Sequence, residues 1–351
     1  MSNPTLDKWR ERLRWLASQR LFWPLAGLAG LLLFNLLFTK GFFNFEVRGG
    51  HLYGPLVDIL NNGSEAILLA LGMTMVIAVE GVDLSVGSIM AISGGIVAWC
   101  VTETQADVGT IIALALLASL VAGLLNGVLV GLVRIQPIVA TLILMVGGRG
   151  VAKLITGGQL PFKHPDFAFI GNGHLMGIPV TVIIAVVVCL ITAVVIRRTA
   201  MGTFIEAVGD NETASRFSGI NAPLVKVLVY TFCGLCAGIA GIIAACDVTS
   251  ADSTTVGKFS ELDAIFAVIV GGTAFTGGRF TIVGSIIGAV LIQTLTTTMI
   301  IWGVPSHVAP APKAIVIIAV CLIQSDNFRR HVRRLFSAVG LAPKSGGGAA
   351  P

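Results

Sequence analysis

Residues 108–133 read VGTIIALALLASLVAGLLNGVLVGLV and contain no charged side chain. A helix needs about 20 apolar residues to cross the hydrocarbon core of a bilayer, and this run is longer than that. Other apolar runs precede and follow it, at 21–38, 64–79, 85–102, 138–155, 178–196, 224–246, 262–275, 282–302 and 309–324. The sequence therefore predicts an all-α integral membrane protein with about ten transmembrane helices.

The composition of the whole chain agrees with a membrane protein. Of its 351 residues 55% are hydrophobic and only 12% are charged, about half the charged share of a soluble globular protein. Too few charges remain to cover a water-exposed surface, which excludes an ordinary soluble enzyme. The net charge is +5, but the basic residues stand in clusters between apolar runs. That pattern indicates membrane topology, so no nucleic acid is expected as a partner.

Counting Lys and Arg on alternate sides of the runs predicts the orientation. One side carries 16 of these residues and the other carries 4. By the positive-inside rule the richer side is cytoplasmic, and both termini lie there. The richer side comprises 1–20, 80–84, 134–137, 197–226, 276–281 and 325–351. The expected organisation is a basic N-terminus at 1–20, one transmembrane domain at 21–325, and a basic, then Gly/Ala-rich tail at 326–351.

Part of the sequence occurs twice. Val86-Gly87-Ser88-Ile89 recurs as Val283-Gly284-Ser285-Ile286, and each copy follows an apolar run and a polar glycine turn. The second turn contains Arg279. An internal helix–polar turn–helix repeat of this kind is typical of transporters, although chance similarity between glycine-rich helices is the alternative. The spans place both copies in the same orientation.

Each copy begins with an acidic residue, Glu65 or Asp263. We expect both residues at the outer ends of the repeated helices. There they would either face a shared vestibule or cap their own helix starts.

Polar residues interrupt apolar surroundings at three places and are candidates for a substrate path. Asp83, with Ser85, is either part of a gate or the N-cap of the next helix. Arg149 lies inside a span between glycines, and it either faces a polar cavity or extends to the outer interface. Asn126 is expected to form hydrogen bonds between helices, with lining of the path as the alternative.

Residues 197–223 form the one substantial cytoplasmic loop. Asp210 as N-cap and Gly219 as helix stop predict a short helix over 211–218. A second amphipathic turn precedes it, with apolar side chains at Phe204, Ile205 and Val208. Two small helices with apolar anchors among charges of both signs predict a docking surface for a soluble partner. A plain interfacial loop is the alternative.

Several sequence motifs are missing. The chain has no G-x-x-x-x-G-K-[ST] phosphate cradle, no His/Cys cluster with metal spacing and no grouped Ser/His/Asp set. No catalytic residue, metal site or cofactor is therefore expected in this chain, and an enzymatic function is not predicted.

Three stretches together resemble sugar ABC-importer permeases of the ribose/xylose/arabinose type. Residues 81–88, GVDLSVGS, resemble the family signature G-[IV]-D-L-S-V-G. Residues 206–220 resemble its cytoplasmic stretch A-x-G-x-N-x-x-A-x-x-x-G-[IV]. The third signature is matched by Glu261-Leu262-Asp263-Ala264-Ile265 with Gly271-Gly272-Thr273 and Gly277-Gly278-Arg279. The resemblance covers about residues 55–325.

A narrower resemblance is to galactofuranose-type permease subunits, based on 135–152 and 204–209. One departure is Glu80, where the family usually has glycine. Glu80 places a second acid close to Asp83, so the sugar of galactofuranose-type permeases cannot simply be assigned to this chain.

The resemblance implies a bacterial inner-membrane permease that works by alternating access. Its implied partners are cytoplasmic ATPase subunits that bind ATP and Mg, a periplasmic sugar-binding protein, and a second, identical or paralogous permease. The implied ATPase-coupling residues are Phe204, Glu206, Gly209, Asp210, Asn211, Glu212, Arg216 and Gly219. The candidates for the substrate path or gate are Glu65, Glu80, Asp83, Ser85, Asn126, Arg149, Asp263 and Arg279. The alternative function is an ion-coupled secondary transporter of a small polar solute, in which Glu80 and Asp83 would bind the ion.

Overall fold

The computed structural model describes residues 21–48, 51–305 and 308–324. The chain divides into two compact units, Met1–Val304 and Pro305–Pro351, and each is described by itself. The second unit contributes helix α14 (Pro310–Gln324) to the described part. The predicted cytoplasmic ends, 1–20 and 326–351, lie outside the described residues.

The mostly helical class is confirmed, because every predicted apolar run coincides with a helix. Within the described residues, seven helices are long and apolar enough to cross a membrane. They are α3 (Pro55–Ala78), α4 (Val86–Glu103), α5 (Val108–Gly127) continued by the π-helix η1 (Val128–Leu132), α6 (Pro137–Thr156), α8 (Val180–Arg198), α11 (Ala222–Asp247) and α13 (Ile282–Ile301). The other runs form the shorter helices α2 (Phe22–Phe38), α12 (Ser260–Val270) and α14. The number of ten crossings stays a prediction.

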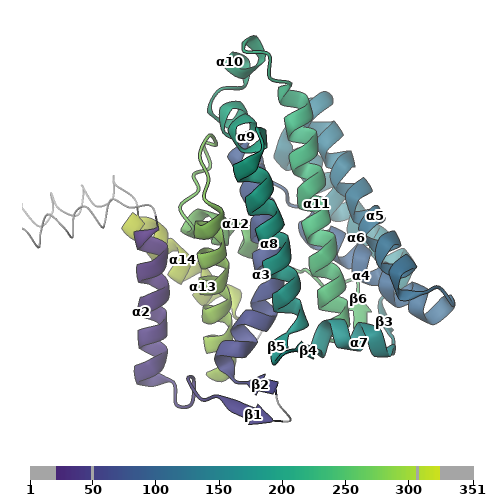
Figure 1. Ribbon diagram of the computed structural model, residues 1–351, viewed down its shortest axis with the longest axis vertical. Coiled ribbons are helices and arrows are strands. Elements are labelled where there is room, and N and C mark those ends of the chain that lie inside the picture. Colours follow the sequence, from purple (N-terminus) through teal and green to yellow (C-terminus); the bar gives the residue numbers. More distant parts are fainter. Residues whose placement is uncertain (1–20, 49–50, 306–307, 325–351) are drawn as a thin grey trace, which may run out of the picture. The chain divides into compact units, whose positions relative to one another are not determined.

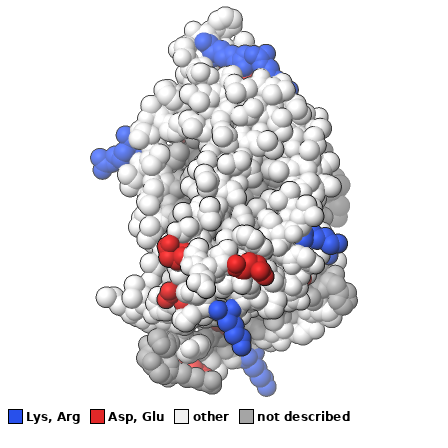
Figure 2. All heavy atoms as spheres, turned by 90° about the vertical axis from the view of Figure 1, so that its right-hand side faces the viewer, with Lys and Arg blue, Asp and Glu red and all other residues white. Residues whose placement is uncertain are grey.

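Helix α11 lies at the centre of the first unit, where it packs against α3, α4 and α5 (Figure 1). Glycines allow the close approach to α5: a Cβ on Gly234 would lie 2.7 Å from the Cα of Gly123. Small residues at such contacts let helix backbones approach without a hydrophobic driving force from water. Helices α5, α6 and α8 bury far less of their surface inside the chain than α11 does. Over most of the face in Figure 2 no charged side chain is visible, as expected for a surface that contacts lipid.

The connecting segments gather at two ends. At one end, α9 (Met201–Asp210) and α10 (Glu212–Phe217) lie near the top of Figure 1. At the other end are α7 (Pro165–Asn172) and three antiparallel two-stranded ribbons. These pair β1 (Glu46–Arg48) with β2 (His51–Tyr53), β3 (Gln159–Pro161) with β6 (Ser250–Asp252), and β4 (His174–Leu175) with β5 (Ile178–Pro179). The ribbons and α7 were not anticipated from the sequence.

The two copies of Val-Gly-Ser-Ile both occupy the first turn of a helix, α4 and α13. Their surroundings differ, however. Ser88 donates to the carbonyl oxygen of Leu144 in α6, whereas Ser285 accepts from the hydroxyl of Thr74 in α3 at 2.7 Å. The preceding helices also differ in length, because α3 has 24 residues and α12 has 11. The internal repeat therefore stays a prediction.

The expected position of Glu65 is wrong. Helix α3 begins at Pro55, so Glu65 lies ten residues into the helix and cannot cap its start. The apolar run begins only at residue 64, because Asp58, Asn61 and Asn62 precede it. These polar residues do not interrupt the helical backbone, so the helix starts earlier than the run. Asp263, by contrast, does lie in the first turn of α12.

Candidate functional site

The turn 79–85 between α3 and α4 is a buried polar network. The side chains of Asp83, Ser85 and Asn126 are all fully buried. Oδ1 of Asp83 accepts from the backbone N–H of Ser85 at 2.9 Å and from its hydroxyl at 2.6 Å. Nδ2 of Asn126, near the end of α5, donates to Oγ of Ser85 at 2.8 Å. Asn126 therefore fixes the turn to α5, and Asp83 orders the chain just before α4 begins.

The network leaves two oxygens without a conventional partner. Within the described chain, Oδ2 of Asp83 and Oδ1 of Asn126 are buried and accept no hydrogen bond. The thiol of Cys233 in α11, a weak donor, lies beside the Asp83 carboxylate. This neighbour could not be predicted from the sequence, because Cys233 lies in an apolar run like any other small helix residue. A buried carboxylate of this kind in a membrane protein is a candidate functional group.

Arg149 reaches from α6 to the segment 253–259. Its Nη1 donates to the carbonyl oxygen of Ser253 at 3.1 Å and to that of Val256. The carboxylate of Glu261 and Nη2 of Arg149 both lie close to Gly87, where a Cβ would be 2.7 Å from the former and 3.1 Å from the latter. The guanidinium thus has protein partners, and Glu261 joins the cluster although the sequence had singled out Asp263 instead.

Three segments meet at a contact that we call the glycine junction: Ala78 at the end of α3, Gly209 in α9, and Gly277 with Gly278. The backbone N–H of Gly278 donates to the carbonyl oxygen of Ala78 at 3.0 Å. A Cβ on Gly209 would overlap that same carbonyl oxygen and would lie 2.5 Å from the nitrogen of Gly278. Only glycine at position 209 allows this approach, so α9 is seated directly on both polar turns.

Glu80 stands at the edge of the glycine junction. Its backbone is left-handed, with φ of 59°, a conformation that glycine adopts without steric cost. Glycine, the residue that the resemblance implies at this position, would adopt this geometry more easily than Glu80 does. Its side chain is exposed and passes close to Gly277. Arg279, also exposed, follows in the same turn.

The loop between α8 and α11 contains the two expected short helices. The cap of the second is Asn211, whose side chain accepts from the N–H of Ala214 at 2.9 Å. The prediction of Asp210 as the cap is wrong, because Asp210 is the last residue of α9. Gly219 follows α10 with φ of 87°, so its role as helix stop is confirmed.

Glu212 forms one ion pair within α10 and a second that ties α10 to α11. Glu212 binds Arg216 at 2.8 Å and Lys226 at 2.6 Å. The hydrogen bond from Lys226 and the charges of Lys226 and Arg216 hold the pKa of Glu212 below its ordinary value, despite partial burial. Beside this anchored carboxylate, apolar and acidic side chains are exposed. They are Phe204, Glu206, Asp210 and Phe217, of which Phe217 is 90% exposed.

The two acidic residues of the predicted repeat have different neighbours. The carboxylate of Glu65 lies close enough to Asp247, at the end of α11, for their charges to repel. Asp263 acts in the same way on Glu261. Within the described residues, no group of three or more His, Cys, Asp or Glu side chains is placed to hold a metal ion.

The helical core, the buried polar turn and the loop seated upon it define a membrane transport protein. The model of the family described as "Branched-chain amino acid transport system / permease component" matches residues 56–324, and the chain belongs to this family.

Curated relatives support the same assignment. The galactofuranose transporter permease YtfT of Escherichia coli K12 is 43% identical over 88% of this chain and 92% of its own. The fructose import permease FruF of Bifidobacterium longum is 37% identical over 89% of each chain. The ribose import permease RbsC of E. coli K12 is 40% identical over 78% of this chain and 86% of its own. No solved structure matches. The resemblance to sugar-importer permeases is thereby confirmed, and the chain is a permease subunit.

Proposed function

We propose that the chain is the permease subunit of an ATP-driven, binding-protein-dependent importer of a monosaccharide, with galactofuranose first among the sugars to test. The glycine junction carries this proposal. It seats α9 on the end of α3 and on the turn before α13 through backbone contacts. A soluble motor subunit that moved α9 would therefore move two helices of the core, with no flexible side chain between them. Relatives named for galactofuranose, fructose and ribose transport supply the substrate class.

In this proposal the ATPase binds the exposed side chains of α9 and α10. Phe204 and Phe217 offer apolar contact and Glu206 and Asp210 offer charge, while the ion pairs of Glu212 hold α10 in place. ATP and Mg would bind to the partner. The α9–α10 end would then be cytoplasmic, as the positive-inside rule predicts, and the opposite end would receive the binding protein in the periplasm. A second permease subunit would complete the pathway.

The proposed substrate path involves the two polar clusters, of which the first is fully buried and the second is half-buried at Arg149. Hydroxyl groups of a sugar are donors and acceptors, and they are bound by carboxylates, amides and guanidinium groups. The Asp83–Ser85–Asn126 network and the Arg149–Glu261 pair supply all three kinds. We propose that the conformational cycle exposes them in turn and that Glu80 and Arg279 flank the cytoplasmic exit.

Uptake into proteoliposomes tests the function. The chain would be reconstituted with its partner ATPase and binding protein, and labelled galactofuranose, ribose, fructose and leucine would be offered separately. ATP-dependent accumulation of one sugar, abolished when the ATPase lacks its P-loop lysine, is the expected result. Accumulation driven by an ion gradient without ATP would overturn the proposal in favour of secondary transport. Accumulation of leucine alone would overturn the substrate class.

A further inference from the structure

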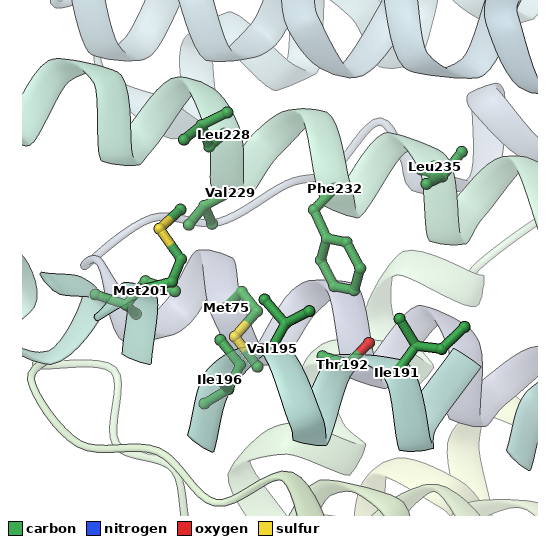
Figure 3. Close-up of a pocket in the computed structure, with 11 residues that line it drawn as sticks. Met75, Ile191, Thr192, Val195, Ile196, Met201, Leu228, Val229, Phe232 and Leu235 are labelled. Carbon is green, nitrogen blue, oxygen red and sulfur yellow. The ribbon is translucent and has the colours of Figure 1, made fainter. Parts of the chain in front are cut away.

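Helices α3, α8, α9 and α11 enclose a cavity of about 320 Å³ that the proposed transport function does not use (Figure 3). Its deep side is formed by the buried residues Met75, Ile205 and Val229. Its rim is formed by Ile191, Val195 and Leu228, which are 59%, 42% and 45% exposed. The cavity is therefore a pocket open to the surface of the helix bundle, between α8 and α11.

The chemistry of the lining excludes a polar ligand inside the pocket. Ten of the eleven lining residues are apolar, and the exception is Thr192. Its hydroxyl already donates to the carbonyl oxygen of Val188 at 2.8 Å, within α8. A sugar or a chain of water molecules would find almost no hydrogen-bond partner there, and buried polar groups without partners are costly. The contents must be apolar, and in a bilayer the apolar molecules at hand are lipid acyl chains.

A basic residue stands where the headgroup of such a lipid would lie. Helix α8 lines the pocket with Ile191, Thr192, Val195 and Ile196 and ends at Arg198. Because residues three and seven apart share a helix face, Arg198 lies on the same face as Val195 and Ile191, one turn nearer the helix end. Arg197 is rotated by about 100° from that face. Both arginines are exposed, and in the described chain neither forms an ion pair.

We propose that this pocket binds one anionic phospholipid of the surrounding bilayer, with an acyl chain between α8 and α11 and the phosphate on Arg198. Basic residues beside pockets between transmembrane helices attract anionic headgroups in this way. The pocket also contacts the proposed docking helix, because Met201 and Ile205 of α9 line it. A bound acyl chain would therefore support α9 from beneath, on the side opposite to its exposed residues.

Native mass spectrometry of the full-length chain, purified with its partner chains, tests the proposal. Phosphatidylglycerol and phosphatidylcholine with the same acyl chains would be titrated separately. We expect one tightly held phosphatidylglycerol and weaker binding of phosphatidylcholine. Arg198→Gln should lower the affinity for phosphatidylglycerol about fivefold, the contribution of one basic residue near an anionic lipid. Arg197→Gln, the matched control, should lower it much less.

The pocket itself is tested by Val195→Phe, which fills it from the lipid-facing rim. This variant should lose the tightly held lipid while the chain still assembles with its partners. Should Val195→Phe fail to assemble, the comparison between Arg198→Gln and Arg197→Gln decides. Equal retention of both lipids by the wild type, or equal effects of the two arginine variants, would overturn the proposal. So would an unchanged lipid count in an assembled Val195→Phe complex, since the lipid would then be bound elsewhere.

Discussion

The backbone N–H of Gly278 donates to the carbonyl oxygen of Ala78 at 3.0 Å, although the two residues lie 200 positions apart in the sequence. Gly209 of α9 packs against the same pair of backbone groups. A displacement of α9 must therefore displace the end of α3 and the turn before α13.

Gly209→Ala should disrupt the glycine junction. The new methyl group would overlap the carbonyl oxygen of Ala78, a backbone atom that cannot rotate away. Overpacking of this kind costs about 1–3 kcal/mol. We expect ATP-driven uptake to fall at least tenfold while the variant still inserts into the membrane. The control is Gly30→Ala in α2, because nothing lies within 4 Å of a Cβ at that position. Equal uptake by the two variants would contradict the coupling role of the junction.

Glu80→Gly should stabilise the chain. A residue with a Cβ in the left-handed region is strained by about 1–2 kcal/mol relative to glycine, and Glu80 has φ of 59°. Glycine also gains entropy in the unfolded chain, so a net gain below about 1 kcal/mol is expected. The midpoint of thermal unfolding in detergent measures this gain and should rise in Glu80→Gly. In Glu80→Val the midpoint should fall, because a branched side chain is strained further at the same φ. A midpoint unchanged in both variants would show that the left-handed backbone is not strained.

The apolar helices and the two short helices of the loop 197–223 follow from the sequence, whereas the glycine junction and the polar clusters do not. Apolar runs predict helices because backbone N–H and C=O groups in lipid must form their hydrogen bonds within the chain. Gly219 ends α10 because glycine adopts a positive φ without steric cost. The start of α3 was missed because polar residues within the helix masked its first turns. The meeting of Ala78 with Gly209 and Gly278 depends on packing between segments far apart in the chain, which no local pattern records.

The ion pairs of Glu212 should make the α10 segment sensitive to acid. Because Lys226 and Arg216 lower the pKa of Glu212, their stabilisation is fully present above the unfolded pKa of about 4.3 and is lost as the pH falls through the lower folded pKa. The partners are partly exposed, so the contribution is about 1 kcal/mol or less. Hydrogen exchange over 211–226, corrected for intrinsic rates, should rise below pH 5 in the wild type.

Glu212→Gln should remove this pH dependence, because the exchange is then already raised at pH 7. Glu206→Gln, an exposed carboxylate of the neighbouring helix, serves as the control and should keep it. If the exchange in Glu212→Gln still rose with acid as steeply as in the wild type, another group would be responsible.

Asn126→Asp should be more damaging than Asn126→Ala. The alanine variant loses the donor to Ser85 and leaves a buried hydroxyl less satisfied, at about 1–3 kcal/mol. The aspartate variant also places a second carboxylate beside Asp83 in a fully buried site, where like charges repel strongly. The amount of folded protein in the membrane should be highest for the wild type, lower for Asn126→Ala and lowest for Asn126→Asp. If the aspartate variant were as stable as the wild type, water would have to reach the network.

Arg149 should hold the segment 253–259 in place. Its guanidinium donates to two carbonyl oxygens of that segment and faces Glu261, an arrangement that a shorter, single ammonium group cannot reproduce. Arg149→Lys should therefore fold but lose at least tenfold in uptake, and Arg149→Met should also raise hydrogen exchange over 253–259. Lys153→Met, one turn along the same helix and exposed, should behave like the wild type. Full uptake in Arg149→Lys would show that the charge alone suffices, and unchanged exchange in Arg149→Met would show that the segment is held by other contacts.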